Sequence, residues 1–531
     1  MQYFIGIDSG TTSIKAVLFD IEGNELGKKA MPLTGIFPEE NQYEEDMREI
    51  WEKARLCIRD ITSRFDKDSI VGVGITAQGD GLWMLDDAGE PVRNGCCFCD
   101  GRAAEFVDQW VTDGTCDKLF ELTGTRIFTG NQNGIVKWME KYEKDNLDKS
   151  RSLLHLKDFL FYKMTGRLTT DASDQSLIMI DPVTRQYIDE AFDLCGILPY
   201  REKYPPIKTA SENTIKMLRE VALELGLNEN VLVTSGPMDV VACALGSGVV
   251  ERGHCCSIIG TAALHEMVID KPLSDDIRAG MTVTHVMEDR WLRLMASLAG
   301  TPNLEWMLNT IGKQVKLDAE AARENVYAYM EKMLDTVPIG SRGVMYHPYL
   351  LAGGERAPFT DARARASYTG ISVRHTLEDI VRATYEGVAF AMLDCYSHMP
   401  GHIEQVTVCG GGANSNAWCQ MFSDALGVKI FTVKGEELGA KGAAVNNAVV
   451  QGFYKDYREA VQKTVEIDRV FKPDMGRHAK YMKYYELYKS TYHAIQETWK
   501  LRASLLGGEN KQWSLKMNGA KSSTPAEPCS N

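Results

Sequence analysis

Residues 3–20 read YFIGIDSGTTSIKAVLFD. The pattern predicts an apolar strand that ends near the acidic residue Asp8, a turn of small residues over 9–13, and a second strand over 14–20. Such a turn exposes backbone N–H groups and hydroxyl groups together, which suits a phosphate. Hairpins also carry Gly-Thr turns for purely conformational reasons, so this stretch needs support from the rest of the chain.

The second half of the chain repeats the arrangement. Residues 256–263 predict a strand that meets a turn at Gly260-Thr261, and residues 264–269 predict the strand that follows. The two hairpins lie roughly 250 residues apart, which is a plausible length for one domain. The repetition therefore suggests two related domains that face one shared nucleotide.

Between the two hairpins, another acidic residue follows a predicted strand. Residues 231–235 form a short apolar run that leads into Gly236-Pro237-Met238-Asp239 and an Ala/Val-rich helix. Asp239 is thus expected where a strand ends and a helix begins, near the positive end of the helix dipole. Taken alone, this position favours an N-cap. In a cleft, a carboxylate there is also a plausible general base.

Toward the C-terminus, a strand over 406–409 is expected to lead into the glycine-rich turn 410–416. Residues 417–426 then predict a helix, and residues 439–449 predict a helix of small residues that packs closely against a neighbour. Nearer the N-terminus, residues 45–62 show helical periodicity, and residues 70–76 read as a buried strand.

The composition and net charge exclude several classes of protein. The 531 residues are 44% hydrophobic and 25% charged, enough for two domains with ample cores. The net charge of -14 argues against nucleic acids and anionic membranes as partners. No apolar run approaches the roughly 20 residues that a membrane helix needs, and no basic leader precedes Asp8. The 13 cysteines, an odd number, fit a reducing cytoplasm better than a disulfide framework.

The cysteine cluster Cys96-Cys97-Phe98-Cys99 contains a C-x-x-C spacing. No second pair follows at a distance suited to zinc, and no thioredoxin-like pattern surrounds it. Small buried or loop thiols are the favoured interpretation, and the role of the cluster is left open. The common G-x-x-x-x-G-K-[ST], G-x-G-x-x-G, H-E-x-x-H and G-x-S-x-G motifs are missing, so phosphate binding must come from the hairpin turns.

Several motifs in order along the chain carry a specific resemblance. They are Gly6-Ile7-Asp8-Ser9-Gly10-Thr11-Thr12-Ser13, Ala77-Gln78-Gly79-Asp80-Gly81, Thr165-Gly166, Gly236-Pro237-Met238-Asp239, Gly260-Thr261, Gly354-Glu355-Arg356-Ala357-Pro358 and Gly410-Gly411-Gly412-Ala413-Asn414. From Tyr3 to about Gly452 the chain resembles the FGGY family of carbohydrate kinases. Within that family it is most similar to the erythritol kinase and L-xylulose kinase group, on cues such as Gln78-Gly79-Asp80-Gly81-Leu82-Trp83 and Tyr346-His347-Pro348-Tyr349.

The resemblance implies an α/β fold of two ribonuclease-H-like lobes, the actin-like ATPase fold, with a cleft between them. Residues 1–248 would form the N-terminal lobe, with the substrate and the catalytic base. Residues 249–505 would form the C-terminal lobe, with the nucleotide. The segment 506–531 is polar and turn-rich, so we expect it to be disordered.

The resemblance also implies roles for single residues. Asp239 matches the general base that takes the proton from the substrate hydroxyl, and Asp8 with Asp239 would hold Mg²⁺. The residues that would contact ATP are Thr11, Thr12, Ser13, Lys15, Gly260, Thr261, Gly411, Gly412 and Asn414. Lys15 is as easily a solvated lysine. Gly300 falls in a nucleotide-proximal stretch, but the reading Gly300-Thr301-Pro302 departs from the family and leaves its role in doubt.

The substrate pocket is expected between the lobes. The residues that would bind substrate hydroxyls are Gln78, Asp80, Gln132 and Asp239, with Asn131 as a further polar contact. Gly79 stands where glycerol kinases have arginine, which argues against glycerol. Trp83 is more often a core residue. Asp100 and Arg102 align loosely with a lid loop, and Glu355 with Arg356 is expected to form an internal ion pair.

These observations predict an ATP-dependent kinase of a small polyol or sugar, with erythritol or a related tetritol or pentitol as the leading substrate. L-Xylulose or D-xylulose is the alternative. A different class is an ATP-gated binding module of the actin or chaperone type without phosphoryl transfer, but such a module needs no base that faces a second ligand. We expect no nucleic-acid or membrane partner, a cytoplasmic location, and leave a homodimer open.

Overall fold

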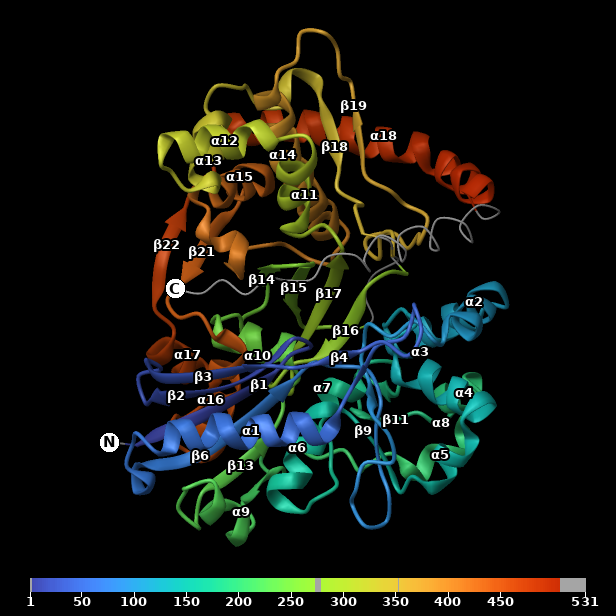
Figure 1. Cartoon of the computed structure of the whole chain (residues 1–531), viewed down its shortest axis with the longest axis vertical. Coiled ribbons are helices and arrows are strands. Elements are labelled where there is room, and N and C mark those ends of the chain that lie inside the picture. The colour runs from blue at the N-terminus through green and yellow to red at the C-terminus, as the bar shows by residue number, and fades with distance from the viewer. Residues whose placement is uncertain (1, 273–277, 352, 507–531) are drawn as a thin grey trace, which may run out of the picture.

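The computed structural model describes residues 2–272, 278–351 and 353–506. It has two lobes, each built around one mixed β-sheet (Figure 1). The first sheet has the strand order β12-β13-β6-β1-β2-β3. Its strands are β1 (Tyr3–Ser9), β2 (Ser13–Asp20), β3 (Glu25–Pro32), β6 (Ile70–Ala77), β12 (Thr214–Lys216) and β13 (Leu232–Ser235).

The predicted hairpin is confirmed as β1 and β2, which pair antiparallel with Asp8 opposite Lys15. Their inward side chains, among them Ile5 and Ile7, are almost completely buried. Helix α1 (Met47–Thr62) packs on this sheet through an apolar face, and the side chain of Asp46 caps it by accepting from Arg48 N. The predicted helix over 45–62 therefore starts two residues later than its periodicity suggested.

The second sheet has the order β16-β17-β15-β14-β20-β21-β22. Its strands are β14 (His254–Ile259), β15 (Ala263–Ile269), β16 (Met281–Thr284), β17 (Trp291–Ser297), β20 (Gln405–Cys409), β21 (Lys429–Val433) and β22 (Ile467–Phe471). Residues of helices α14 (Leu377–Ser397), α15 (Asn416–Leu426) and α18 (Met475–Leu506) share one large apolar core with β14, β15 and β20. The second predicted hairpin and the predicted helix over 417–426 are thus confirmed.

Two helices, α10 (Asp239–Gly246) and α16 (Leu438–Val450), pack against each other, and α16 also packs on β1 and β6 of the first sheet. In Figure 1 the orange-red ribbon of α16 lies among the blue strands of the first lobe. Glycines allow these contacts: a Cβ on Gly6 would lie 1.9 Å from Ala440 O, and one on Gly442 would lie 1.8 Å from Ala242 O. The close packing predicted for residues 439–449 is confirmed, and its partner belongs to the other half of the chain.

Smaller elements complete each lobe. Those of the first lobe are β4 (Gly35–Ile36), β5 (Glu44–Glu45), β7 (Trp83–Leu85), β8 (Gly95–Cys96), β9 (Ser152–Leu154), β10 (Ile180–Asp181), β11 (Gln186–Tyr187), α2 (Ala104–Thr112), α3 (Thr115–Thr123), α4 (Gln132–Tyr142), α5 (Lys144–Lys149), α6 (Leu156–Thr165), α7 (Ala172–Gln175), α8 (Asp189–Leu194) and α9 (Arg219–Glu224). Those of the second are α11 (Pro302–Thr310), α12 (Lys313–Ala322), α13 (Val326–Leu334), β18 (Met345–His347) and β19 (Ser367–Thr369). Helix α17 (Tyr457–Thr464) packs beside α16 on the first lobe, where Ala460 shares an apolar cluster with Phe4 and Val17.

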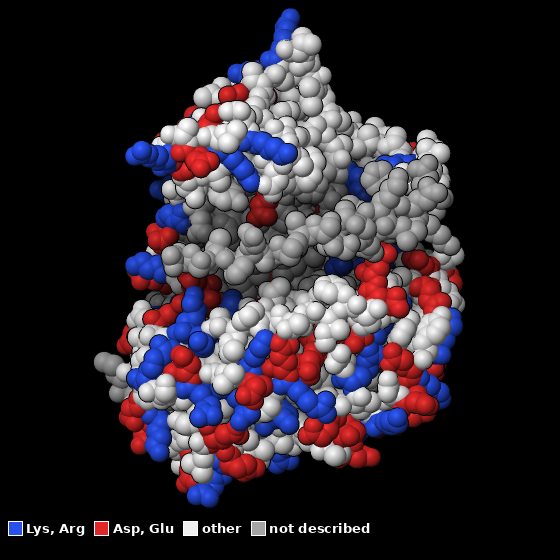
Figure 2. Space-filling view, viewed as in Figure 1, with Lys and Arg blue, Asp and Glu red and all other residues white. Residues whose placement is uncertain are grey.

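Acidic and basic side chains intermingle over the face of the first lobe that Figure 2 shows. Within the described ranges, no helix combines the length and the apolar character needed to cross a membrane. The tail predicted to be disordered lies, from residue 507 onward, outside the described residues.

Candidate active site

Asp239 is the first residue of α10, directly after the turn that leaves β13. The turn is fixed by hydrogen bonds: Thr76 Oγ1 donates to Pro237 O at 2.7 Å, and Met238 N donates to Ser173 Oγ at 2.9 Å. The carboxylate accepts from Val240 N at 2.8 Å, as expected at the start of a helix. Burial, together with the nearby negative charge of Asp8, raises the pKa of Asp239 to about 7.

Asp8 on β1 therefore lies close enough to Asp239 for the two carboxylates to repel each other. Burial raises the pKa of Asp8 to about 6, with Lys15 acting in the opposite direction. A Cβ on Gly439 would lie 2.7 Å from Asp8 Oδ2, so the start of α16 borders this carboxylate. Two partly buried carboxylates that repel each other are oxygen donors suited to a hard cation, so these residues fit Mg²⁺.

The first predicted phosphate turn joins β1 to β2. It is closed by a hydrogen bond from Gly10 N to Ser13 O at 3.1 Å, and Thr12 is exposed. Thr11 Oγ1 is already engaged, because it donates to Gln78 Oε1 at 3.0 Å. Lys15 forms an ion pair of 2.7 Å with Glu437, so it is neither free nor simply solvated.

The second predicted turn, Gly260-Thr261, joins β14 to β15. Thr301 donates to Gly260 O from its backbone N at 2.8 Å and from its hydroxyl at 3.0 Å. A Cβ on Gly300 would lie 2.3 Å from the same carbonyl oxygen, so the glycine lets the two segments touch. The structure thus brings Gly300 to this turn, although the sequence around it departs from the family.

The glycine-rich turn after β20 is a short 3-10 helix, Gly411–Asn414. Gly412 is buried against Ile259, whereas a Cβ on Gly411 would meet nothing within 4 Å. Gly411 and Asn414 are exposed. The backbone at Gly411 is therefore accessible, as a turn that contacts a ligand requires.

The predicted substrate residues divide into two groups. Asp80 has φ 57°, an uncommon backbone conformation for a residue other than glycine. It accepts from Asn131 Nδ2 at 2.6 Å, while Asn131 Oδ1 accepts from Phe128 N at 2.6 Å. Burial raises the pKa of Asp80 well above its usual range, and the charges of Asp174 and Asp239 raise it further. Asp80, Asn131 and Asp239 thus belong to one site.

Gln78 is largely satisfied by the protein itself. Its Nε2 donates to Glu45 Oε2 at 2.8 Å, and its Oε1 accepts from Thr11 and from Cys97 Sγ at 2.9 Å. Gln132 Nε2 donates to Leu154 O at 2.9 Å, but the buried Gln132 Oε1 has no hydrogen-bond partner among the residues that the structure describes. Gln78 therefore contacts the first predicted phosphate turn through Thr11, while Gln132 keeps one acceptor available.

Three expectations need correction or refinement. Asp100 and Arg102 do not form an accessible lid, because both side chains are 0% exposed and form a 2.8 Å ion pair. Glu355 accepts from Ser297 Oγ and from backbone N–H groups, and no ion pair with Arg356 occurs among the described residues. Cys96 and Cys97 are buried thiols, as expected, but Cys97 also contacts Gln78 and so borders the site.

Sequence reasoning missed two parts of the site. Arg356 of the second lobe lies over the Phe128 ring at 4.9 Å, and its charge acts on Asp80 of the first lobe. Below the site, the fully buried Lys157 forms ion pairs with Asp171 at 2.8 Å and Asp174 at 3.0 Å. The sequence contains the motif around Arg356, but it does not show that this side chain of the second lobe lies near Asp80 of the first lobe.

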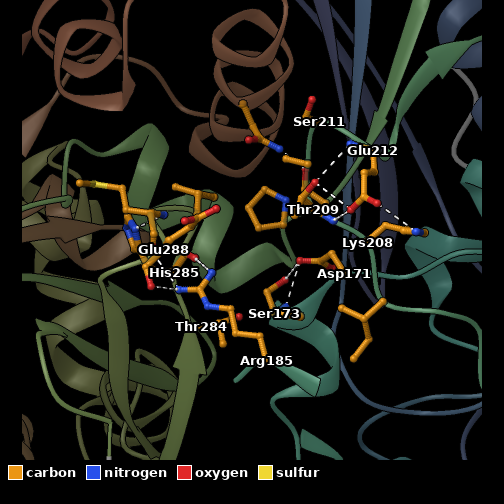
Figure 3. A pocket seen from close by; sticks show the side chains of 18 of the residues that line it. Asp171, Ser173, Arg185, Lys208, Thr209, Ser211, Glu212, Thr284, His285 and Glu288 are labelled. Carbon is orange, nitrogen blue, oxygen red and sulfur yellow. Dashed lines mark hydrogen bonds and ion pairs between the residues drawn. The ribbon is translucent and has the colours of Figure 1, made fainter. Parts of the chain in front are cut away.

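A cavity of about 880 Å³ lies beside the Gly236-Pro237 turn (Figure 3). Its lining includes Asp171, Ser173 and Arg185 but none of the predicted site residues. Arg185 donates to backbone carbonyls of the second half, at 2.9 Å to Met287 and 2.8 Å to Glu288. The cavity is therefore a second opening between the two halves and not the site built by Asp8, Asp80 and Asp239.

Comparison with known proteins finds matches to both halves of the chain. The N-terminal domain of the FGGY family of carbohydrate kinases matches residues 3–246, and its C-terminal domain matches residues 255–450. The chain is 29% identical to the erythritol kinase of Brucella abortus, over 94% of this chain and 98% of that protein. It is 28% identical to the L-xylulose/3-keto-L-gulonate kinase of Escherichia coli, over 93% of this chain and 97% of that protein.

Solved structures share the fold. The ligand-bound xylulose kinase from Lactobacillus acidophilus superposes with a TM-score of 0.87 at 23% identity, covering 94% of this chain and 99% of that one. The Plasmodium falciparum glycerol kinase with ADP superposes with a TM-score of 0.80 at 20% identity, covering 93% and 98%. The predicted fold, two α/β lobes of the actin-like ATPase type, is thereby confirmed.

Proposed function

Because the chain belongs to the FGGY family of carbohydrate kinases, we propose that it transfers the γ-phosphate of ATP to a hydroxyl of erythritol or a related tetritol or pentitol. The observation that carries the proposal is the meeting of Asp8, Asp80 and Asp239 in one site between the lobes. Membership of a kinase family favours phosphoryl transfer over a nucleotide-gated module. L-Xylulose or D-xylulose is the second candidate, supported by relatives of that name.

Mg²⁺ bound by Asp8 and Asp239 would supply charge neutralisation at the β- and γ-phosphates, which phosphoryl transfer requires. The turns at Thr11–Ser13 and Gly260-Thr261 would hold the phosphates with backbone N–H groups and hydroxyls. The open backbone at Gly411 and the exposed Asn414 would border the adenosine.

Asp239 is the proposed base, which accepts the proton of the attacking hydroxyl at a carboxylate oxygen. Hydrogen bonds at Met238 N and Val240 N fix the start of α10 and the carboxylate of Asp239, so the accepting oxygen is held in place for the reaction. Asp80, oriented by Asn131, would accept hydrogen bonds from neighbouring hydroxyls of a polyol. A Cβ on Gly79 would lie 2.9 Å from Met238 Sδ, so a larger residue at position 79 would require the Met238 side chain to move.

The test of the kinase assignment is Asp239→Asn. This change keeps the size of the side chain and removes the proton acceptor, so kcat should fall by roughly 10²–10⁴-fold, while ATP binding measured by calorimetry should change little. The matched control is Asp46→Asn at the N-cap of α1, where asparagine caps as well as aspartate and activity should persist. Near-normal turnover of Asp239→Asn at saturating substrate would refute the role of Asp239.

The substrate is tested by ADP release with a panel of tetritols, pentitols and pentuloses. We expect the highest kcat/KM with erythritol or another four- or five-carbon polyol. A clear preference for L-xylulose or D-xylulose would overturn the substrate and leave the kinase assignment intact. Absence of ADP release with every member of the panel would count against both.

Two further expectations accompany the proposal. Cysteines of the described ranges all carry free thiols, which supports a reducing compartment such as the cytoplasm. The homodimer remains a prediction, as does the division of the chain into residues 1–248 and 249–505.

A further inference from the structure

Three thiols from separate elements meet behind the active site. Cys243 lies on α10, Cys256 on β14 and Cys409 on β20. Their Sγ atoms all lie within 4.8 Å of one another, and those of Cys256 and Cys409 are 3.9 Å apart. Zinc–sulfur bonds of about 2.3 Å place the sulfurs of a tetrahedral site about 3.8 Å apart. These sulfurs therefore already stand close to the spacing of metal ligands.

A buried carboxyl group faces the thiols across the β14–β15 strand pair, with its oxygens more than 4.8 Å from at least one of the three sulfurs. Glu266 on β15 stands directly opposite Cys256 in the antiparallel register, so both side chains project from the same face of the sheet. Its side chain is 0% exposed, and neither carboxyl oxygen has a hydrogen-bond partner in the described part of the chain. A buried polar group left unpaired is destabilising, and a bound cation would remove that cost.

Metals bind cysteine in its thiolate form. Ser247 Oγ donates a hydrogen bond to Cys256 Sγ at 3.6 Å, which stabilises that form of the sulfur. A divalent cation would stabilise the thiolate of Cys256 and the ionised carboxylate of Glu266 together.

Access to the cluster comes through Cys243, the one thiol of the three that is only partly buried. It follows Asp239 by one turn on the same face of α10. No ion pair reaches Glu266 within the described ranges, unlike the cluster of His155, Asp158 and Asp174, where Lys157 already supplies the positive charge.

We propose that Cys243, Cys256, Cys409 and Glu266 bind a thiophilic divalent cation, zinc in the first place, which ties α10 to β14 and β20. Each thiol, and the carboxyl group of Glu266, releases its proton to solvent as its bond to the metal forms. Three sulfur donors select a soft or borderline cation over Mg²⁺, so this site is chemically distinct from the one at Asp8 and Asp239. The proposal does not depend on the kinase assignment.

Cobalt(II) is the probe, added to the full chain after treatment with a chelator and a reductant. The expected result is one equivalent of Co²⁺ with sulfur-to-cobalt charge-transfer bands, lost on addition of Zn²⁺. Cys243→Ser and Cys409→Ser should abolish these bands. The matched control is Cys255→Ser, because Cys255 is also buried on β14 but projects from the opposite face of the strand. Bands that persist in both cluster variants, or no bands in the wild type, would overturn the proposal.

Thermal unfolding gives a second readout. Zn²⁺ should raise the Tm of the wild type and of Cys255→Ser, and leave the Tm of Cys243→Ser unchanged, since a cation stabilises only the state that binds it. Glu266→Gln should weaken Co²⁺ binding by on the order of 10-fold or more. Equal affinity in wild type and Glu266→Gln would overturn the assignment of Glu266 as the fourth ligand.

Discussion

At the scale of single residues, Asp80 combines an unusual backbone conformation with a buried carboxyl group. Its φ of 57° is tolerated by asparagine and aspartate better than by alanine. A substitution therefore tests two properties at once unless a conservative variant separates them. Asp80→Asn keeps the backbone preference and the size, whereas Asp80→Ala loses both the carboxylate and this preference.

We predict that Asp80→Ala lowers kcat/KM for the preferred polyol by on the order of 10²-fold or more, because buried hydroxyls of the substrate lose their acceptor. Nucleotide affinity should stay unchanged, since the phosphate turns lie elsewhere. Deoxy analogues that lack the hydroxyl held by Asp80 should lose far less than the parent polyol. Equal losses for all analogues would mean that Asp80 only shapes its loop, and the role would pass to Gln132 or Asn131.

Glu45 carries a prediction about pH. Burial raises its pKa from 4.5 to about 7, so between these values the folded chain holds a proton that the unfolded chain has released. Its contribution to stability is therefore complete below about pH 4.5 and is lost as pH rises to about 7. The loss is at most about 3 kcal/mol.

Urea unfolding at pH 5 and pH 8 measures this effect. Glu45→Gln should reduce the loss of unfolding free energy between the two pH values, whereas the exposed Glu40→Gln should behave like the wild type. A loss of the same size in Glu45→Gln and wild type would show that Glu45 titrates normally.

The positions of two candidate site residues could be predicted because each ends a recognisable local pattern. Asp8 follows an apolar alternation and Asp239 follows a short apolar run, while the roles proposed for them come from the family resemblance. The contacts of Glu45, Lys157 and Arg356 could not be predicted, because they are made with residues far away in the chain. No local periodicity encodes the hydrogen bond between Glu45 and Gln78, or the position of Arg356 over Phe128.

At the scale of elements, the strand–turn–strand units were predictable because alternation and turn residues are short-range signals. For helix α16, these short-range signals predict the helix but not its packing partners. Its small residues predicted close packing, but nothing in residues 439–449 identifies β1 and β6 as the partners. Helix α16 packs on β1 and β6 because these two strands are neighbours in the first sheet. The order of strands in a sheet depends on the whole fold and is not encoded locally.

We predict that Gly442→Ala destabilises the protein by about 1–3 kcal/mol or more, because the added Cβ would meet Ala242 O at 1.8 Å and force α10 and α16 apart. Chemical denaturation measures the change. Gly411→Ala is the contrasting variant: its Cβ meets nothing within 4 Å, so stability should change by less than about 0.5 kcal/mol while nucleotide binding weakens. Equal stability of the two variants would contradict the packing argument.

At the scale of the whole molecule, the two predicted phosphate turns lie one in each lobe, at Thr11–Ser13 and at Gly260-Thr261. A nucleotide that contacts both turns, and a substrate that contacts Asp80 and Arg356, would draw the lobes together. We predict a smaller radius of gyration, by small-angle scattering, with polyol plus a non-hydrolysable ATP analogue than without ligands. Each ligand alone is the control, and no compaction with both ligands at saturation would contradict closure.

The position of α16 also affects how the protein is made. The strands of the first sheet leave the ribosome early, yet residues 438–450, which cover its glycine-lined face at Gly6 and Gly74, are synthesised near the end. A nascent chain halted before residue 438 therefore exposes a sheet face whose cover does not yet exist. The first lobe to be translated is thus completed only when nearly the whole chain has been synthesised, and during that interval it depends on protection from aggregation.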